Sequence, residues 1–117
     1  MPFAEDSIYN PRPARSGWRV LVMRRWPRGV RKNQVDEWLP DAAPSLDLLR
    51  GYREGKLDFK GLAERYTAEL RTRAAVLRHL RDLERAHRNV VLLCWERPPR
   101  PCHRTVLVRV LSRRRAR

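Results

Sequence analysis

The stretch "NVVLLCWERPPRPCHR" occupies Asn89–Arg104 and predicts a strand that runs into a helix through a proline-rich turn. Its apolar residues, bounded by an asparagine on one side and prolines on the other, favour a strand over Asn89–Trp95. The same stretch holds both cysteines of the chain, one of its three histidines and a glutamate. It is therefore a candidate for chemistry or binding as well as the segment that decides the fold.

Two shorter strands are expected earlier in the chain. Gly17–Arg25 contains the apolar run Val20–Val22, typical of a strand covered on both faces, and Asp6–Asn10 is a weaker candidate. Helices are expected over Leu46–Glu54 capped by Ser45, over Phe59–Leu70 capped by Asp58, and, after a break at Leu70–Thr72, up to His87 with Thr72 as cap. The segment "TVLVRVLSRRRAR" that follows the last prolines fits either a strand or a helix.

This order of elements predicts a small α/β fold. A chain of 117 residues is long enough for one compact domain and too short for two ordinary ones. We expect two or three layers, a short, mostly parallel sheet of about three strands, three to four helices and a right-handed crossover. The domain is expected to span residues 5–112, followed by a basic tail over residues 113–117.

The chain is strongly basic, with 27 Lys and Arg against 13 Asp and Glu and a net charge of +14. Such a charge favours binding to nucleic acid or another polyanion, because neutralised phosphates release counterions. A protein from an arginine-rich proteome has the same composition, so charge alone leaves both interpretations open. No apolar run is long enough for a membrane span, and the N-terminus lacks the pattern of a signal peptide. We therefore expect a cytoplasmic protein with reduced thiols, no membrane partner and an oligomeric state that the sequence does not define.

A basic loop, Met23–Lys32, follows the second expected strand, where ligands of open α/β sheets usually bind. Arginines surround Trp26 there, and Gly29 allows the backbone to turn. An aromatic ring among arginines suits a base or a phosphate attached to a ring. Alternatively, the loop is a tight turn and Trp26 packs in the core.

The proline-rich loop after the third strand admits four interpretations. Cys94–Arg100 has the C-x5-R spacing of cysteine phosphatases, although the two prolines inside it lack the N–H groups such a loop needs. Cys94, Cys102 and His103, with Glu96 as a fourth ligand, form an unusual zinc-ligand spacing. Cys102 at a helix start, with His103 as base and Glu96 or Arg104 nearby, fits an activated nucleophile. Two buried structural cysteines are the fourth interpretation.

Several segments of the sequence, taken together, resemble a known protein family. The segments "IYNPRPARSGWRVLVMRRWPRGVRK", "VDEWLPDAAPSLDLLR", "FKGLAERYTAEL" and "VVLLCWE…CHRTVLVRVL" closely resemble the YeaO-like bacterial proteins, the family called domain of unknown function 488 (DUF488), over Ile8–Leu111. The resemblance implies a small cytoplasmic α/β protein without an established reaction, and a helix opening at "CHR". Similar proteins usually carry an aspartate where this chain has Met23, whereas many share its C-x-E…C-H-R pattern.

Our favoured hypothesis is an anion-binding pocket, for phosphate or a nucleotide, between the WPRG loop and the start of the CHR helix. The ligand-binding candidates are Arg24, Trp26, Arg28, Gly29, Cys94 and Arg104, and the catalytic candidates are Cys102, His103 and Glu96. This hypothesis includes no metal and no cofactor. The alternative is a nucleic-acid-binding module that uses the arginines of the Thr72–His87 helix and of the C-terminal tail.

Overall fold

The sheet is parallel throughout and its central strand is the one the sequence predicts most strongly. The computed structural model describes residues 3–13, 17–96 and 102–113. Its four strands follow the order β1-β4-β2-β3. Their bounds are Phe3–Ser7 for β1, Trp18–Leu21 for β2, Glu37–Trp38 for β3 and Val90–Cys94 for β4. The two-residue β3 is an addition to the sequence prediction, and β1 begins three residues before the expected strand.

Four helices accompany the sheet, and this confirms the predicted α/β class. They are α1 (Leu46–Arg53), α2 (Phe59–Arg71), α3 (Ala74–His87) and α4 (His103–Arg113), with short 3-10 turns at Lys32–Gln34 and Pro40–Ala42. The segment that fitted either a strand or a helix is therefore α4, as the family resemblance implies. No helix in the described ranges is long and apolar enough to cross a membrane. Residues 114–117 of the predicted basic tail lie outside the described residues.

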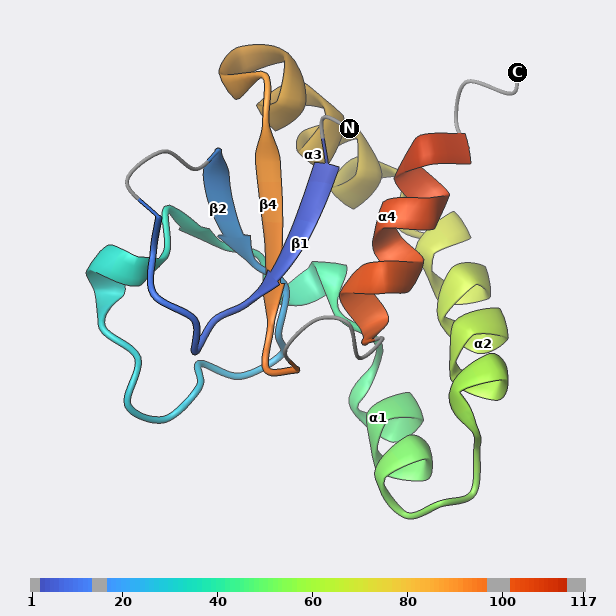
Figure 1. Cartoon of the computed structure of the whole chain (residues 1–117). Helices are drawn as coiled ribbons and strands as arrows, with labels where there is room; N and C mark the ends of the chain where they lie inside the picture. The colour runs from blue at the N-terminus through green and yellow to red at the C-terminus, as the bar shows by residue number, and fades with distance from the viewer. Residues whose placement is uncertain (1–2, 14–16, 97–101, 114–117) are drawn as a thin grey trace.

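The helices pack on one face of the sheet and loops pack on the other (Figure 1). Alternate strand residues Val20, Val90 and Leu92 join the helices in one continuous core cluster. Leu21 and Leu93, whose side chains point the opposite way, pack with Ile8 and with apolar residues of the loop that follows β2. The strands and helices therefore form two layers. On the loop side of the sheet, no described α-helix covers the carboxyl ends of the strands.

Local capping explains where the helices begin and end. The Ser45 hydroxyl accepts the Leu48 N–H at 3.3 Å and the Asp58 carboxylate accepts the Gly61 N–H at 2.8 Å, as predicted. The prediction that Thr72 caps α3 is wrong. Its hydroxyl donates to the Glu69 carbonyl oxygen at 2.7 Å and closes α2, because the chain between the two helices is too short to free Thr72 from the preceding turn.

The start of β2 passes so close to the turn before β4 that Gly17 has no room for a side chain. The N–H of Trp18 donates to the Asn89 carbonyl oxygen at 2.9 Å, and a Cβ on Gly17 would overlap that carbonyl and approach the Asn89 Cβ to 2.8 Å. Gly51, inside α1, is different, because a Cβ there would meet nothing closer than 3.5 Å.

We expect Gly17→Ala to lower the free energy of unfolding by about 1–3 kcal/mol, since the added methyl group displaces the β2–β4 contact. Gly51→Ala should instead be neutral or raise it by up to about 1 kcal/mol, because alanine has the better helix propensity. Urea unfolding monitored by circular dichroism measures both. Equal effects of the two substitutions would contradict this account of the sheet.

Candidate functional site

A cavity of about 700 Å³ opens beyond the carboxyl ends of β2 and β4, where α1 passes beside them. In open α/β sheets this is the usual position of a ligand. The lining residues come from the loop after β2, from α1, from the segment after β4 and from the first turn of α4. They are Met23, Arg24, Arg25, Leu46, Leu49, Arg50, Tyr52, Arg53, Trp95, Glu96 and His103.

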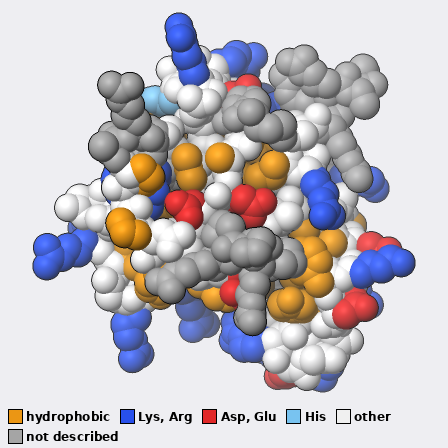
Figure 2. All heavy atoms as spheres, viewed as in Figure 1, with side chains coloured by type: hydrophobic (Ala, Val, Ile, Leu, Met, Phe, Trp, Pro, Cys, Tyr) orange, Lys and Arg blue, Asp and Glu red, His pale blue; other side chains and the backbone are white. Residues whose placement is uncertain are grey.

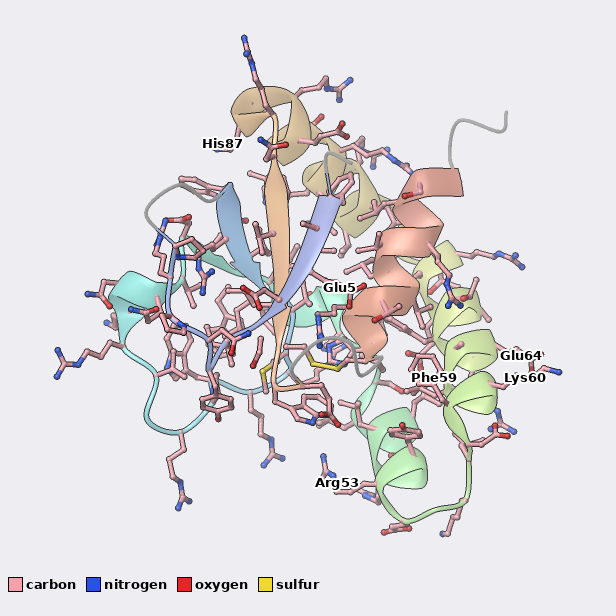
Figure 3. The ribbon with its side chains drawn as sticks, in the orientation of Figure 1. Glu5, Arg53, Phe59, Lys60, Glu64 and His87 are labelled. Carbon is pink, nitrogen blue, oxygen red and sulfur yellow. A yellow bond between two sulfur atoms is a disulfide. The ribbon has the colours of Figure 1, made fainter. Side chains whose placement is uncertain are left out.

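The lining is basic and aromatic. Four arginines face one glutamate, and two large rings, those of Tyr52 and Trp95, form part of the wall. Within the described residues, Arg25 and Arg53 make no hydrogen bond or ion pair, and Arg50 makes only a loose i,i+3 pair with Asp47 at 3.8 Å. Figure 3 shows Arg53 beside α1, on the side of that helix nearer to the end of β4. Unpaired guanidinium groups beside aromatic rings can bind an anion that carries a ring.

Arg24 differs from the other arginines, because its guanidinium is already engaged. Nε donates to the Pro44 carbonyl oxygen at 3.0 Å and Nη2 to the Ala43 carbonyl oxygen at 3.2 Å. Nη1 pairs with Asp41 at 3.0 Å. Arg24 therefore ties the loop after β2 to the residues that start α1, and so positions the wall that carries Arg50 and Arg53.

His103 is buried under the cavity, and its Nε2 contact fixes the orientation of the ring. Nε2 contacts the Val22 carbonyl oxygen, which can only accept, so Nε2 carries the proton and Nδ1 keeps its lone pair. Nδ1 faces the Sγ atoms of Cys94 and Cys102, each 3.6 Å away. Burial lowers the pKa of His103 from 6.5 to about 4. The ring is therefore neutral at physiological pH and presents an acceptor to the two sulfurs.

Cys94 and Cys102 form a disulfide, which corrects the expectation of two free thiols. Cys94 ends β4 and Cys102 immediately precedes α4, and the sheet and helix bring their Cα atoms to 7.1 Å from each other. Both residues are buried. A thiol nucleophile at Cys102 is therefore present only after reduction. Arg100, required for the phosphatase interpretation, lies outside the described residues.

Arg104 lies inside the molecule and does not line the cavity. Its side chain is fully buried, and Nε lies 3.2 Å from Oε1 of Glu5, which also accepts the Thr105 hydroxyl at 2.7 Å (Figure 3). Nη1 and Nη2 have no hydrogen-bond partner among the described residues. Burial lowers the pKa of Arg104, while the charges of Glu5, Asp6 and Glu96 raise it. Arg104 thus anchors α4 to β1, with Glu96 close enough to contribute to its electrostatic environment.

The rest of the predicted WPRG site lies elsewhere. Trp26 packs against the Leu21–Leu93 side of the sheet, donates from Nε1 to the Val30 carbonyl oxygen at 3.0 Å and meets Trp38 edge to face. Arg28 and Gly29 are exposed on the turn, where Gly29 has φ +80°. The structure brings together Arg24, Glu96 and His103, but not Trp26, Arg28 and Gly29. The loop's contribution to the cavity comes from Met23–Arg25 alone.

Sequence reasoning missed Arg50, Tyr52, Arg53 and Trp95. Arg50 and Arg53 are three residues apart on α1, so they lie on the same side of that helix. The sequence shows this spacing, but no residue of α1 or next to it indicates that this side of the helix faces the strand ends. Trp95 directly follows β4, and its carbonyl oxygen accepts the Ser7 hydroxyl at 3.1 Å. Its position one residue beyond the strand was the available signal.

A second hollow, of about 510 Å³, lies between α2 and α4 and is a weaker candidate. Phe59, Lys60 and Glu64 mark its α2 side in Figure 3. It is lined by helix residues alone, away from the strand ends, and it contains no histidine or cysteine. The cavity at β2 and β4 is therefore the candidate functional site.

Comparison with known proteins identifies relatives without adding a reaction. The family model described as the active DUF488-N3 subclade (DUF488-N3a) matches residues 6–115. Uncharacterized protein YeaO of Escherichia coli (strain K12) is 37% identical over 65 residues, 54% of this chain and 56% of YeaO. Uncharacterized protein Rv3073c of Mycobacterium tuberculosis (strain H37Rv) is 41% identical over 78 residues, 65% of each chain. The alignments thus span between about half and two thirds of these relatives' lengths. No solved structure matches.

The buried neutral His103 predicts a specific pH dependence of stability. The unfolded chain takes up a proton on this residue near pH 6.5, whereas the folded chain does so only near pH 4. The unfolding free energy should therefore fall as the pH drops from about 6.5 to 4, by up to about 3 kcal/mol from this residue. His103→Gln should remove that part of the slope, and His87→Gln, at an exposed position, should keep it. Urea unfolding across this pH range measures the slopes.

Ring NMR signals test the same point without a variant. The His103 ring should not titrate between pH 5 and 8. Parallel stability curves for wild type and His103→Gln, or a His103 ring that titrates near pH 6.5, would contradict the buried neutral state.

Proposed function

The chain belongs to the DUF488 family, in its active N3 subclade, and from this premise we propose that it binds a phosphate-bearing ligand with an aromatic ring, such as a mononucleotide, in the cavity beyond β2 and β4. The volume of about 700 Å³ is in the range of small-molecule sites. The placement beyond the carboxyl ends of the strands is the usual one for such ligands in α/β folds.

The observation that carries the proposal is the combination of unpaired arginines and aromatic rings in one cavity. Arg25 and Arg53 have no partner within the described residues, and Arg50 is held only loosely by Asp47. A guanidinium donates two parallel hydrogen bonds to a phosphate and needs no proton transfer to do so. Trp95 and Tyr52 supply flat apolar surfaces on which a base can stack. Together they suit a ligand with a charged end and a ring.

Two of the three residues proposed for catalysis, Glu96 and His103, line the same cavity. Glu96 is the single carboxylate among the described lining residues and is therefore the candidate acid or base of the cavity. Cys102 becomes a thiol beside Nδ1 of His103 only in the reduced protein. We therefore propose a binding function and assign no reaction.

On one face of the molecule, the distribution of charge does not resemble that of a nucleic-acid-binding surface. On the face seen in Figure 2, Lys and Arg side chains stand mostly around the edge, while acidic and hydrophobic side chains occupy the middle. A nucleic-acid interface instead gathers its cations on one face or stripe. On α3, Arg85 contacts Asp82, which reduces the positive charge there.

We expect calorimetric titration of the wild type to show saturable binding of a nucleoside monophosphate. Arg53→Ala should weaken it on the order of ten-fold, because one charge-assisted hydrogen bond of about 1.4 kcal/mol is lost. Arg78→Ala removes the same charge from an exposed position on α3 and should change the affinity by less than about two-fold.

Short oligonucleotides and a series of salt concentrations supply the control. Binding of oligonucleotides that weakens steeply with salt, and equally in both variants, would overturn the cavity proposal in favour of a basic surface. Absence of any nucleotide or sugar-phosphate binding by the wild type would also overturn it.

A further inference from the structure

We propose that, once their disulfide is reduced, Cys94, Cys102 and His103 bind a thiophilic divalent cation such as Zn²⁺. The three residues come from two elements, the end of β4 and the start of α4, and all are buried. Two thiolates and an imidazole are ligands that zinc prefers. This inference is independent of the proposed ligand of the cavity, and it departs from the sequence-based expectation of no metal.

The distances between ligand atoms fit a tetrahedral ion. Each Sγ lies 3.6 Å from Nδ1 of His103, and the three ligand atoms lie within 4.8 Å of one another. Zinc bonds of roughly 2.3 Å to sulfur and 2.0–2.1 Å to nitrogen, at the tetrahedral angle, place S and N about 3.5 Å apart. The imidazole therefore already stands at ligand distance from both sulfurs, and only the sulfur–sulfur separation must change on reduction.

The second ring nitrogen of His103 makes the contact expected of a metal ligand. Ligating histidines almost always donate their other N–H to a carbonyl or carboxylate, which fixes the tautomer and aims the lone pair. Here Nε2 donates to the Val22 carbonyl oxygen, so the lone pair of Nδ1 is left on the side of the sulfurs.

Adjacent ligands such as Cys102 and His103 seldom converge on one ion when both lie within a helix. In this chain Cys102 lies before the first residue of α4. Its N–H donates to the Thr105 hydroxyl oxygen at 3.2 Å, a capping contact that holds Cys102 outside the helical path. Its sulfur can therefore point to the same side as Nδ1 of the next residue.

Three protein ligands leave a fourth position for a non-protein group. Within the described ranges, no other Cys, His, Asp or Glu joins this group, and Glu96, which the sequence suggested as fourth ligand, is outside it. The remaining residues contribute no such side chain either, since 97–101 reads RPPRP and residues 1–2, 14–16 and 114–117 contain none of these types. A fourth ligand would be water or a bound anion, as in zinc sites that keep an open position.

Reduction of the disulfide, which frees the two sulfur ligands, is an ordinary thiol–disulfide exchange. A dithiol reductant transfers two electrons and two protons to the Cys94–Cys102 bond, which breaks to two thiols while the reductant forms its own disulfide. Binding of the cation then displaces both thiol protons to solvent, and the two thiolates and Nδ1 coordinate the ion. Oxidation of the pair would remove both sulfur ligands and release the cation.

Titration with Co²⁺, a spectroscopic substitute for Zn²⁺, tests the site in the full-length protein. The protein reduced with a phosphine should bind one Co²⁺ per chain with a thiolate-to-cobalt charge-transfer band, and added Zn²⁺ should abolish the band. The oxidised protein should show no band. Cys94→Ser, Cys102→Ser and His103→Gln should each weaken binding by ~10-fold or more, whereas His87→Gln should leave it unchanged.

The comparison of reduced and oxidised wild type needs no variant, so it stands even where a substitution impairs folding. A reduced wild type that gives no thiolate band would overturn the proposal. A band of equal intensity in Cys102→Ser, with its fold confirmed by circular dichroism, would overturn it as well. Neither result bears on nucleotide binding, which is measured separately on the oxidised protein.

Discussion

The hydrogen bond from Nε2 of His103 to the Val22 carbonyl oxygen is the contact on which the arrangement of the site depends. It joins the first residue of α4 to the end of β2, across the carboxyl end of β4, and it is buried. Because an unsatisfied carbonyl or imidazole N–H in this position would cost about 1–3 kcal/mol, the contact holds α4 in one orientation. Tyr66 of α2 packs edge to face on the same ring and donates to the Ala42 carbonyl oxygen, so the wall before α1 is connected to it as well.

That connection explains why the two sulfurs and the cavity lie on either side of one residue. One side of the His103 ring faces two sulfurs, and the residue also lines the basic cavity. Arg24 holds the start of α1 through the Pro44 and Ala43 carbonyl groups, whereas Arg25 and Arg53 line the cavity without a partner among the described residues. Arg104 is neutralised by Glu5 inside the molecule. These arginines thus differ in what surrounds each guanidinium.

The sequence predicts features that depend on neighbours along the chain. The strand at β4 and the caps at Ser45 and Asp58 belong to this class, because a run of apolar residues or a side chain three residues from an N–H defines them, whereas the helix α4 was implied only by the family resemblance. Two other features belong to a second class, which neighbours along the chain do not define. They are the expected ligand-binding role of Trp26 and the unpredicted place of Arg53 in the cavity lining. They depend on which side of the sheet a loop covers and how α1 is turned, and these are decided by packing between distant segments.

The four tryptophans allow the central claim, ligand binding in the cavity beyond β2 and β4, to be tested directly. Trp95 lines the cavity, whereas Trp18 stacks on His87 at the opposite end of the sheet and Trp26 packs on the loop side. A ¹H–¹⁵N NMR titration with a nucleoside monophosphate resolves each indole N–H. The account predicts that the Trp95 indole signal shifts saturably while the Trp18 signal stays in place. A spectrum in which Trp95 does not move, or in which Trp18 and the α3 arginines move instead, would contradict it.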